Sequence, residues 1–176
     1  MYILVVTGAS GSGKTSAVRT LEARGVPGVG CFYFDSIGVP SPEAMQRDHD
    51  GGEQWQAWAT RRWLLQLDQL DSTIRVAVLD AQTRPSFVES ASAECRRRQV
   101  RTILLDCERS ERERWLHTER GQPELATTEM ALWAAYLRGQ ADALALRVVD
   151  TSRIDPIAVT NRLVEIIERL QSGEVK

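Results

Sequence analysis

The segment GASGSGKTS, residues 8–16, carries the residue types that hold a polyphosphate. It matches the pattern G-x-x-x-x-G-K-[ST] in full, in which glycines let the backbone curl and point several N–H groups at one phosphate. In this pattern Lys14 places its ammonium against the β- and γ-phosphates, and the Thr15 hydroxyl binds Mg²⁺. Lys14 and Lys176 are the only lysines among 22 basic residues. A planar arginine fork replaces such a point charge poorly, which explains a lysine at this position.

The residues of this loop expected to contact a nucleotide are Gly8, Ser10, Gly11, Ser12, Gly13, Lys14, Thr15 and Ser16. The loop follows an apolar run and precedes a helical pattern, which is the context that the motif requires.

Four aspartates stand directly after short apolar runs elsewhere in the chain. They are Asp35, Asp80, Asp106 and Asp150. In parallel sheets ligands bind at the carboxyl ends of the strands. We therefore expect chemistry at the edge where these residues and Gly8 would meet.

Alternating strand and helix patterns run through the chain. Strands are predicted at residues 2–6, 31–34, 74–79, 100–105 and 146–149. Helices are predicted at 13–24, 42–71 with an interruption near 50–52, 86–98, 110–120, 127–144 and 156–171. This alternation predicts a three-layer α/β fold, with a five-stranded parallel sheet covered by helices on both faces. We expect residues 1–176 to form a single domain.

Composition excludes several classes of function. The chain is 43% hydrophobic with a net charge of −2, which gives no field that would attract nucleic acid, so a nucleic-acid partner is not expected. No apolar run reaches the ~18 residues of a membrane span, and the N-terminal run is too short for a signal peptide. Three scattered cysteines suggest neither disulfides nor a zinc site, so we expect a cytoplasmic protein.

The motif, the chain length and the element order resemble the nucleoside-monophosphate-kinase-like group of P-loop proteins. This group includes adenylate, shikimate and gluconate kinases and antibiotic phosphotransferases. The resemblance implies ATP and Mg²⁺ as cofactors and a small-molecule acceptor. It also implies a short helical lid at about 108–128, called here the lid segment, and an acceptor-side helical segment at about 41–71. The oligomeric state is left open.

A second resemblance lies in VLDAQTRP, residues 78–85, which is similar to the Asp-Gly-Phe-Pro-Arg segment of adenylate kinases. It implies that Asp80 lies near Mg²⁺ and that Arg84 reaches the acceptor or the transferred phosphate. The chain departs from the family at residues 81–83, which counts against an AMP-type acceptor. A strand-capping aspartate and a surface arginine are the alternative interpretation.

Asp35 follows the second predicted strand, where small-molecule kinases of this group often place an aspartate. The resemblance implies that Asp35 holds an acceptor hydroxyl and accepts its proton. Nucleoside monophosphate kinases need no such base, because their acceptor is already an anion. Asp35 therefore favours an alcohol acceptor, with a turn cap as the alternative.

The lid segment is rich in arginine, and family members use lid arginines to neutralise the transferred phosphoryl group. Arg112 and Arg120 are expected to do so here, with Arg114 third; a salt-bridged surface helix is the alternative. Arg153, after the last strand, is expected to lie against the nucleotide base or else to belong to a helix entry. The basic run at 96–101 is interpreted as a solvated face.

Together these residues predict an ATP-dependent kinase that phosphorylates a small molecule at a hydroxyl group. Two alternatives stay open: a nucleoside monophosphate kinase, and a regulatory ATPase without an acceptor. The guanine-specific pattern N/T-K-x-D is absent from the sequence, since Lys14 is its only lysine before the terminus.

Overall fold

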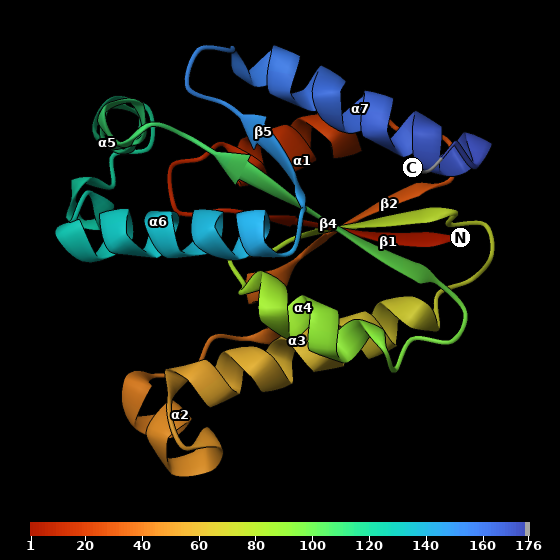
Figure 1. Ribbon diagram of the computed structural model, residues 1–176, viewed down its shortest axis with the longest axis horizontal. Coiled ribbons are helices and arrows are strands. Elements are labelled where there is room, and N and C mark those ends of the chain that lie inside the picture. The colour runs from red at the N-terminus through yellow and green to blue at the C-terminus, as the bar shows by residue number, and fades with distance from the viewer. Residues whose placement is uncertain (175–176) are drawn as a thin grey trace.

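The computed structural model describes residues 1–174, and its centre is a sheet of five parallel strands (Figure 1). The strands are β1 (Tyr2–Thr7), β2 (Val29–Tyr33), β3 (Val76–Asp80), β4 (Gln99–Asp106) and β5 (Arg147–Asp150). Their order in the sheet is β2-β3-β1-β4-β5, and every neighbouring pair is parallel. The predicted three-layer α/β fold is confirmed.

Helices cover both faces of the sheet (Figure 1). The helices α1 (Lys14–Ala23) and α7 (Pro156–Ser172) pack on one face, and α3 (Gly52–Asp68), α4 (Pro85–Ser92) and α6 (Thr128–Ala143) pack on the other. The helix α2 (Pro42–His49) packs against α3 and projects outward, and α5 (Arg109–Thr118) lies in the lid segment. Two short 3₁₀ helices complete the fold, η1 (Phe34–Ile37) and η2 (Pro123–Leu125).

The central strand β1 shows why the chain adopts these layers. Leu4 and Val6 face α1 and α7, whereas Ile3 and Val5 face α3 and α4, and all four are fully buried. Successive side chains of a strand point to opposite faces, so a continuous apolar run needs cover on both sides. The helices supply that cover.

The strand order also locates the site. After β1 the chain crosses to β2 on one side of the sheet, and β4 and β5 extend the sheet on the other side. Such a switch point opens a crevice at the carboxyl ends of the strands. The loop that follows β1 lies at this switch point.

Two predicted boundaries were wrong. The strand β2 begins at Val29 and ends at Tyr33, so Asp35 belongs to η1 rather than to a strand end. The helix α4 ends at Ser92 rather than at residue 98, because residues 93–98 fold over the end of α3 instead. Within the described residues, none of the helices combines the length and the apolar character needed to cross a membrane.

Part of the basic run at 96–101 is buried, contrary to the expectation of a solvated face. Arg98 is 4% exposed, and its guanidinium donates to the backbone oxygens of Leu70, Asp71 and Ile74. A guanidinium can be buried in this way when carbonyl oxygens take up its N–H groups. Arg98 therefore closes the turn between α3 and β3.

Candidate nucleotide and acceptor site

The helix α1 begins with an open N-terminus. Its N-cap is Gly13 in the left-handed conformation (φ 88°), and no side chain caps the first turn. Side chains of Ser41, Thr127 and Asp155 cap α2, α6 and α7, whereas α3, α4 and α5 lack a side-chain cap as α1 does. The free N–H groups of α1, together with the helix dipole, form a site for an anion.

Two glycines of the loop are required by close contacts. A Cβ on Gly8 would collide with the carbonyl oxygen of Leu105 and would lie 2.7 Å from the Ser12 hydroxyl. A Cβ on Gly11 (φ 83°) would lie 2.6 Å from the side chain of Arg112. The loop therefore packs its backbone directly against β4 and α5, which fixes its curvature.

Lys14 is buried and lies across the loop. Its Nζ donates a 3.0 Å hydrogen bond to the carbonyl oxygen of Ala9. The pKa of Lys14 is lowered to about 8, mainly by burial; Asp80 and Asp35 act to raise it, and the positive charge of Arg120 acts in the same direction as burial. A bound polyphosphate would favour the charged ammonium.

Asp80 ends β3 beside Lys14. Burial raises the pKa of its carboxyl group above the usual value, against the opposing influence of Lys14 and of a hydrogen bond from Thr15. The pair of a hydroxyl and a carboxylate suits Mg²⁺, which takes oxygen ligands and usually keeps one or two protein groups beside water and phosphate oxygens. The described residues hold no cluster of three or more His, Cys, Asp or Glu side chains that could bind a metal ion.

Asp35 and Arg120 complete this group of charges. Both are exposed, and both act electrostatically on Lys14 and on Asp80. Asp35 comes from η1 after β2, and Arg120 comes from the lid segment just after α5. The fold thus brings together groups from four separate segments at the carboxyl edge of the sheet.

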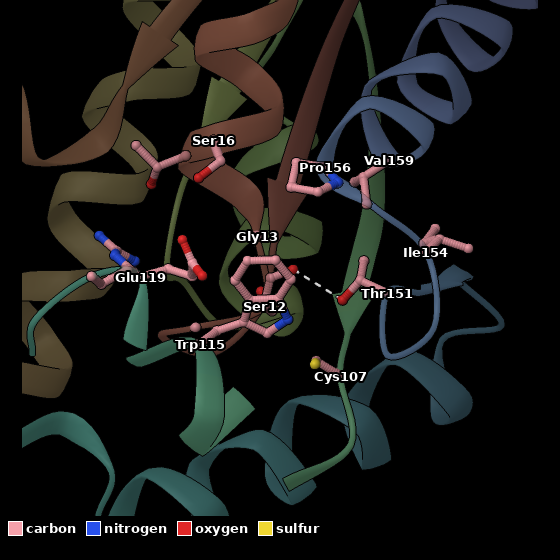
Figure 2. A pocket seen from close by; sticks show the side chains of 13 residues that line it. Ser12, Gly13, Ser16, Cys107, Trp115, Glu119, Thr151, Ile154, Pro156 and Val159 are labelled. Atoms are coloured by element: carbon pink, nitrogen blue, oxygen red, sulfur yellow. Dashed lines mark hydrogen bonds between the residues drawn. The ribbon is translucent and has the colours of Figure 1, made fainter. Parts of the chain in front are cut away.

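A cavity of about 290 Å³ adjoins the loop (Figure 2). Five loop residues line it, namely Gly11, Ser12, Gly13, Thr15 and Ser16. The Thr151 hydroxyl donates a 3.1 Å hydrogen bond to the backbone oxygen of Ser12. Trp115 of α5 forms one wall, and an apolar opposite wall comes from Ile154, Pro156 and Val159. Arg120, Glu119 and Cys107 also line the cavity.

Trp115 was not among the predicted site residues. The signal that could have identified Trp115 is the presence of an aromatic residue within the arginine-rich lid segment.

Arg112 and Arg153 lie outside this cavity lining. Arg112 is buried behind the loop, where it packs against Gly11 and donates to the Cys107 oxygen at 3.2 Å. The side chain of Arg153 is 86% exposed, with its Nη2 3.9 Å from Glu108. The structure therefore brings Arg120, but not Arg112 or Arg153, to the cavity surface.

Arg84 follows β3 and lies between three helices. Its Nη1 donates to Gln56 at 2.6 Å and its Nη2 to Glu53 at 3.1 Å, both on α3. Its guanidinium carbon also lies over three aromatic rings, those of Phe87 (5.1 Å), Trp133 (5.0 Å) and Tyr136 (5.8 Å). Its side chain is only 17% exposed, so Arg84 is held tightly between α3, α4 and α6.

Comparison with known proteins gives a match at the level of structure. No protein-family model matches the chain, and no curated protein matches it. Among solved structures, shikimate kinase from Acinetobacter baumannii in complex with shikimate is 13% identical, with a TM-score of 0.62 over 100% of this chain and 96% of the other. A gluconokinase from Sinorhizobium meliloti 1021 is 16% identical, with a TM-score of 0.63 over 99% and 98%. The tunicamycin resistance protein of Deinococcus radiodurans is 15% identical, with a TM-score of 0.64 over 94% and 95%.

The chain has the fold of the P-loop kinases. The likeness extends over nearly the full length of both chains in each case. This structural likeness confirms the resemblance seen in the sequence. At such low sequence identities the likeness establishes the fold alone.

Proposed function

We propose that this protein is an ATP-dependent phosphotransferase that moves the γ-phosphoryl group of Mg·ATP to a hydroxyl of a small molecule. The observation that carries the proposal is the convergence of Lys14, Thr15 and Asp80 with the exposed carboxylate of Asp35 at one edge of the sheet. The first three residues suit a metal-bound triphosphate, and Asp35 supplies a base beside it. The P-loop kinase fold supports the same activity.

In this proposal the loop amides and Lys14 bind the β- and γ-phosphates. Lys14 exchanges its contact with the Ala9 oxygen for phosphate oxygens. The base of the nucleotide lies in the cavity between Trp115 and the apolar wall of Ile154 and Pro156. Thr15 and Asp80 would hold Mg²⁺, which neutralises charge on the phosphates when bound.

Asp35 orients the acceptor hydroxyl and takes its proton. The bond from the acceptor oxygen to the γ-phosphorus forms as the bond to the β-phosphate oxygen breaks, and ADP leaves with that oxygen. Arg120 neutralises charge on the moving group, because it shares the electrostatic environment of Lys14 and Asp80. Arg112 holds the loop in place from behind.

A cytoplasmic location also remains a proposal, supported by free cysteines at all three positions.

The test is release of ADP from Mg·ATP across a panel of nucleosides, nucleoside monophosphates, sugars, sugar acids and hydroxyl-bearing antibiotics. Lys14→Ala is the blank, and Asp35→Asn tests the base. Turnover of an alcohol that Asp35→Asn abolishes would support the proposal. Turnover of a nucleoside monophosphate that survives Asp35→Asn would replace it with a nucleotide kinase. ATP binding without any acceptor-dependent ADP would favour a regulatory protein.

A further inference from the structure

We propose that the acceptor is an uncharged hydroxyl compound, such as a nucleoside or a glycoside, and not a carboxylate or a phosphate. This inference rests on the proposed function. It follows from the hydrogen bonds, ion pairs and ring contacts that the charged side chains of the acceptor side already form within the protein. Recognition of an anionic acceptor needs a cation that is free to bind it, most often an arginine.

Three of the arginines in this part of the chain are bound elsewhere. On α2, Arg47 forms a two-pronged pair with its neighbour Asp48, with both contacts at 2.8 Å. On α3, Arg61 pairs in the same way with Glu94 of the α4–β4 segment, at 2.6 Å. Arg62 lies over the ring of Trp58 at 5.3 Å. These contacts hold the three guanidinium groups on the outer surface of the helices.

Arg84 is the arginine that follows β3 in the chain, and it is also engaged. Gln56 and Glu53 accept from its two terminal nitrogens, and aromatic rings from α4 and α6 enclose it. Rings over the guanidinium leave little room for a carboxylate to approach it. An anionic acceptor would have to displace Glu53, whose charge already balances that of Arg84.

Apart from Arg120, which the proposed function assigns to the moving phosphoryl group, the charges that remain near the ends of β2 and β3 are negative. Asp35 and Glu53 are both exposed, and Asp80 lies behind them at the end of β3. A carboxylate or phosphate on the acceptor would add a further negative charge to this group, and like charges in close proximity repel. An uncharged substrate can instead donate hydrogen bonds to the same carboxylates, because carboxylates accept hydrogen bonds from hydroxyl groups.

The test uses acceptors in matched pairs that differ in charge: shikimate with its methyl ester, gluconate with glucitol, and AMP with adenosine. ADP release is measured with the full chain and Mg·ATP. We expect kcat/KM for the uncharged member of any productive pair to be at least tenfold higher. A higher value for the charged member would overturn this inference and leave the proposed function in place. No turnover of any member, nor of any other compound in the acceptor panel above, in protein that binds ATP, would overturn both.

A charge variant gives a second measurement on the same pairs. Glu53→Gln releases Arg84 and removes one negative charge, so the ratio of kcat/KM for charged over uncharged acceptors should rise several-fold. The matched control is Glu89→Gln, which makes the same charge change on an exposed residue near the opposite, amino-terminal part of β4. An equal ratio in Glu53→Gln and Glu89→Gln would show that Glu53 and Arg84 do not set the charge preference.

Discussion

The hydroxyl of Ser10 donates a 2.9 Å hydrogen bond to the side-chain oxygen of Gln82, which joins the phosphate loop to the segment after β3. The chain of contacts continues from there. Gln56 donates to the backbone oxygen of Gln82 at 3.0 Å and accepts from Arg84 at 2.6 Å. Both the nitrogen and the oxygen of the Gln56 amide thus form hydrogen bonds. These bonds connect the phosphate loop to helix α3.

Removal of Gln56 should weaken acceptor binding more than ATP binding. Gln56→Ala leaves Arg84 without its closest partner and detaches α3 from Gln82, each at a cost of about 1 kcal/mol. We expect KM for the acceptor to rise about 5- to 30-fold, since 1.4 kcal/mol corresponds to a factor of ten. The dissociation constant for ATP, measured by calorimetry, should change less than about threefold, because the loop keeps its own contacts.

The control for this variant is Gln66→Ala, which removes an exposed amide from the same helix. Equal effects of the two variants on the acceptor KM would contradict a role for this hydrogen-bonded chain.

The buried ammonium of Lys14 predicts a pH dependence of ATP capture. Its pKa is lowered to about 8, so the free protein loses the positive charge as the pH rises through that value. We expect kcat/KM for Mg·ATP to fall above about pH 8. The plateau of kcat should extend to higher pH, because bound phosphates raise the pKa of Lys14. Steady-state rates measured between pH 6 and 10 would test this, and a kcat/KM that stays constant through pH 9 would contradict it.

The sequence predicted the loop at residues 8–16 and the position of Asp80 at the end of a strand because these signals are local. A strand, a glycine-rich turn and a helix start lie within 16 residues, and Asp80 stands directly at the end of an apolar run. Parallel pairing then brings such strand ends to the same edge whatever the loops do. Asp35 reached the same edge even though β2 ended one residue earlier than the apolar run predicted.

The surroundings of Arg84 and Trp115 could not be predicted in this way. The rings over Arg84 come from α4 and α6, the latter almost 50 residues away in sequence, so the enclosure exists only once these helices are packed. Trp115 meets Ile154 and Pro156 only because α5 and the segment after β5 border one cavity. Arg98 was misjudged for the same reason, since its acceptors belong to the α3–β3 turn.

Asp68 should contribute strongly to stability at neutral pH. The carboxylate is buried at the end of α3 and accepts backbone N–H bonds from Arg96, Arg97 and Arg98 at 3.0, 3.0 and 2.8 Å. Burial acts to raise the pKa of Asp68, but these hydrogen bonds outweigh it and hold the pKa below the usual value. We expect Asp68→Asn to lower the free energy of unfolding by about 2 kcal/mol, because the amide leaves donors unsatisfied.

The effect of Asp68 should also depend on pH. For a carboxyl group with a depressed pKa in the folded state, the stabilisation is present above the unfolded pKa and is lost as the pH falls through the folded pKa. The difference between wild type and Asp68→Asn in urea unfolding should therefore be constant near pH 7 and shrink below about pH 4. Glu165→Gln serves as control, because the half-exposed carboxylate of Glu165 only pairs with Arg162 on the surface of α7. A difference that is the same at pH 7 and pH 3 would contradict the assignment.

Trp115 should bind the nucleotide base. Its ring faces an apolar wall across the cavity beside the loop, and stacking of a base on an aromatic side chain contributes about 1–3 kcal/mol. We expect Trp115→Ala to weaken ATP binding about 5- to 100-fold by calorimetry, and Trp115→Phe to retain most of the affinity. Inorganic triphosphate lacks a base, so its binding should be nearly equal in all three proteins. Trp58→Ala, at an exposed tryptophan on α3, is the matched control. A loss of triphosphate affinity in Trp115→Ala as large as the loss for ATP would assign the ring to the loop rather than to the base.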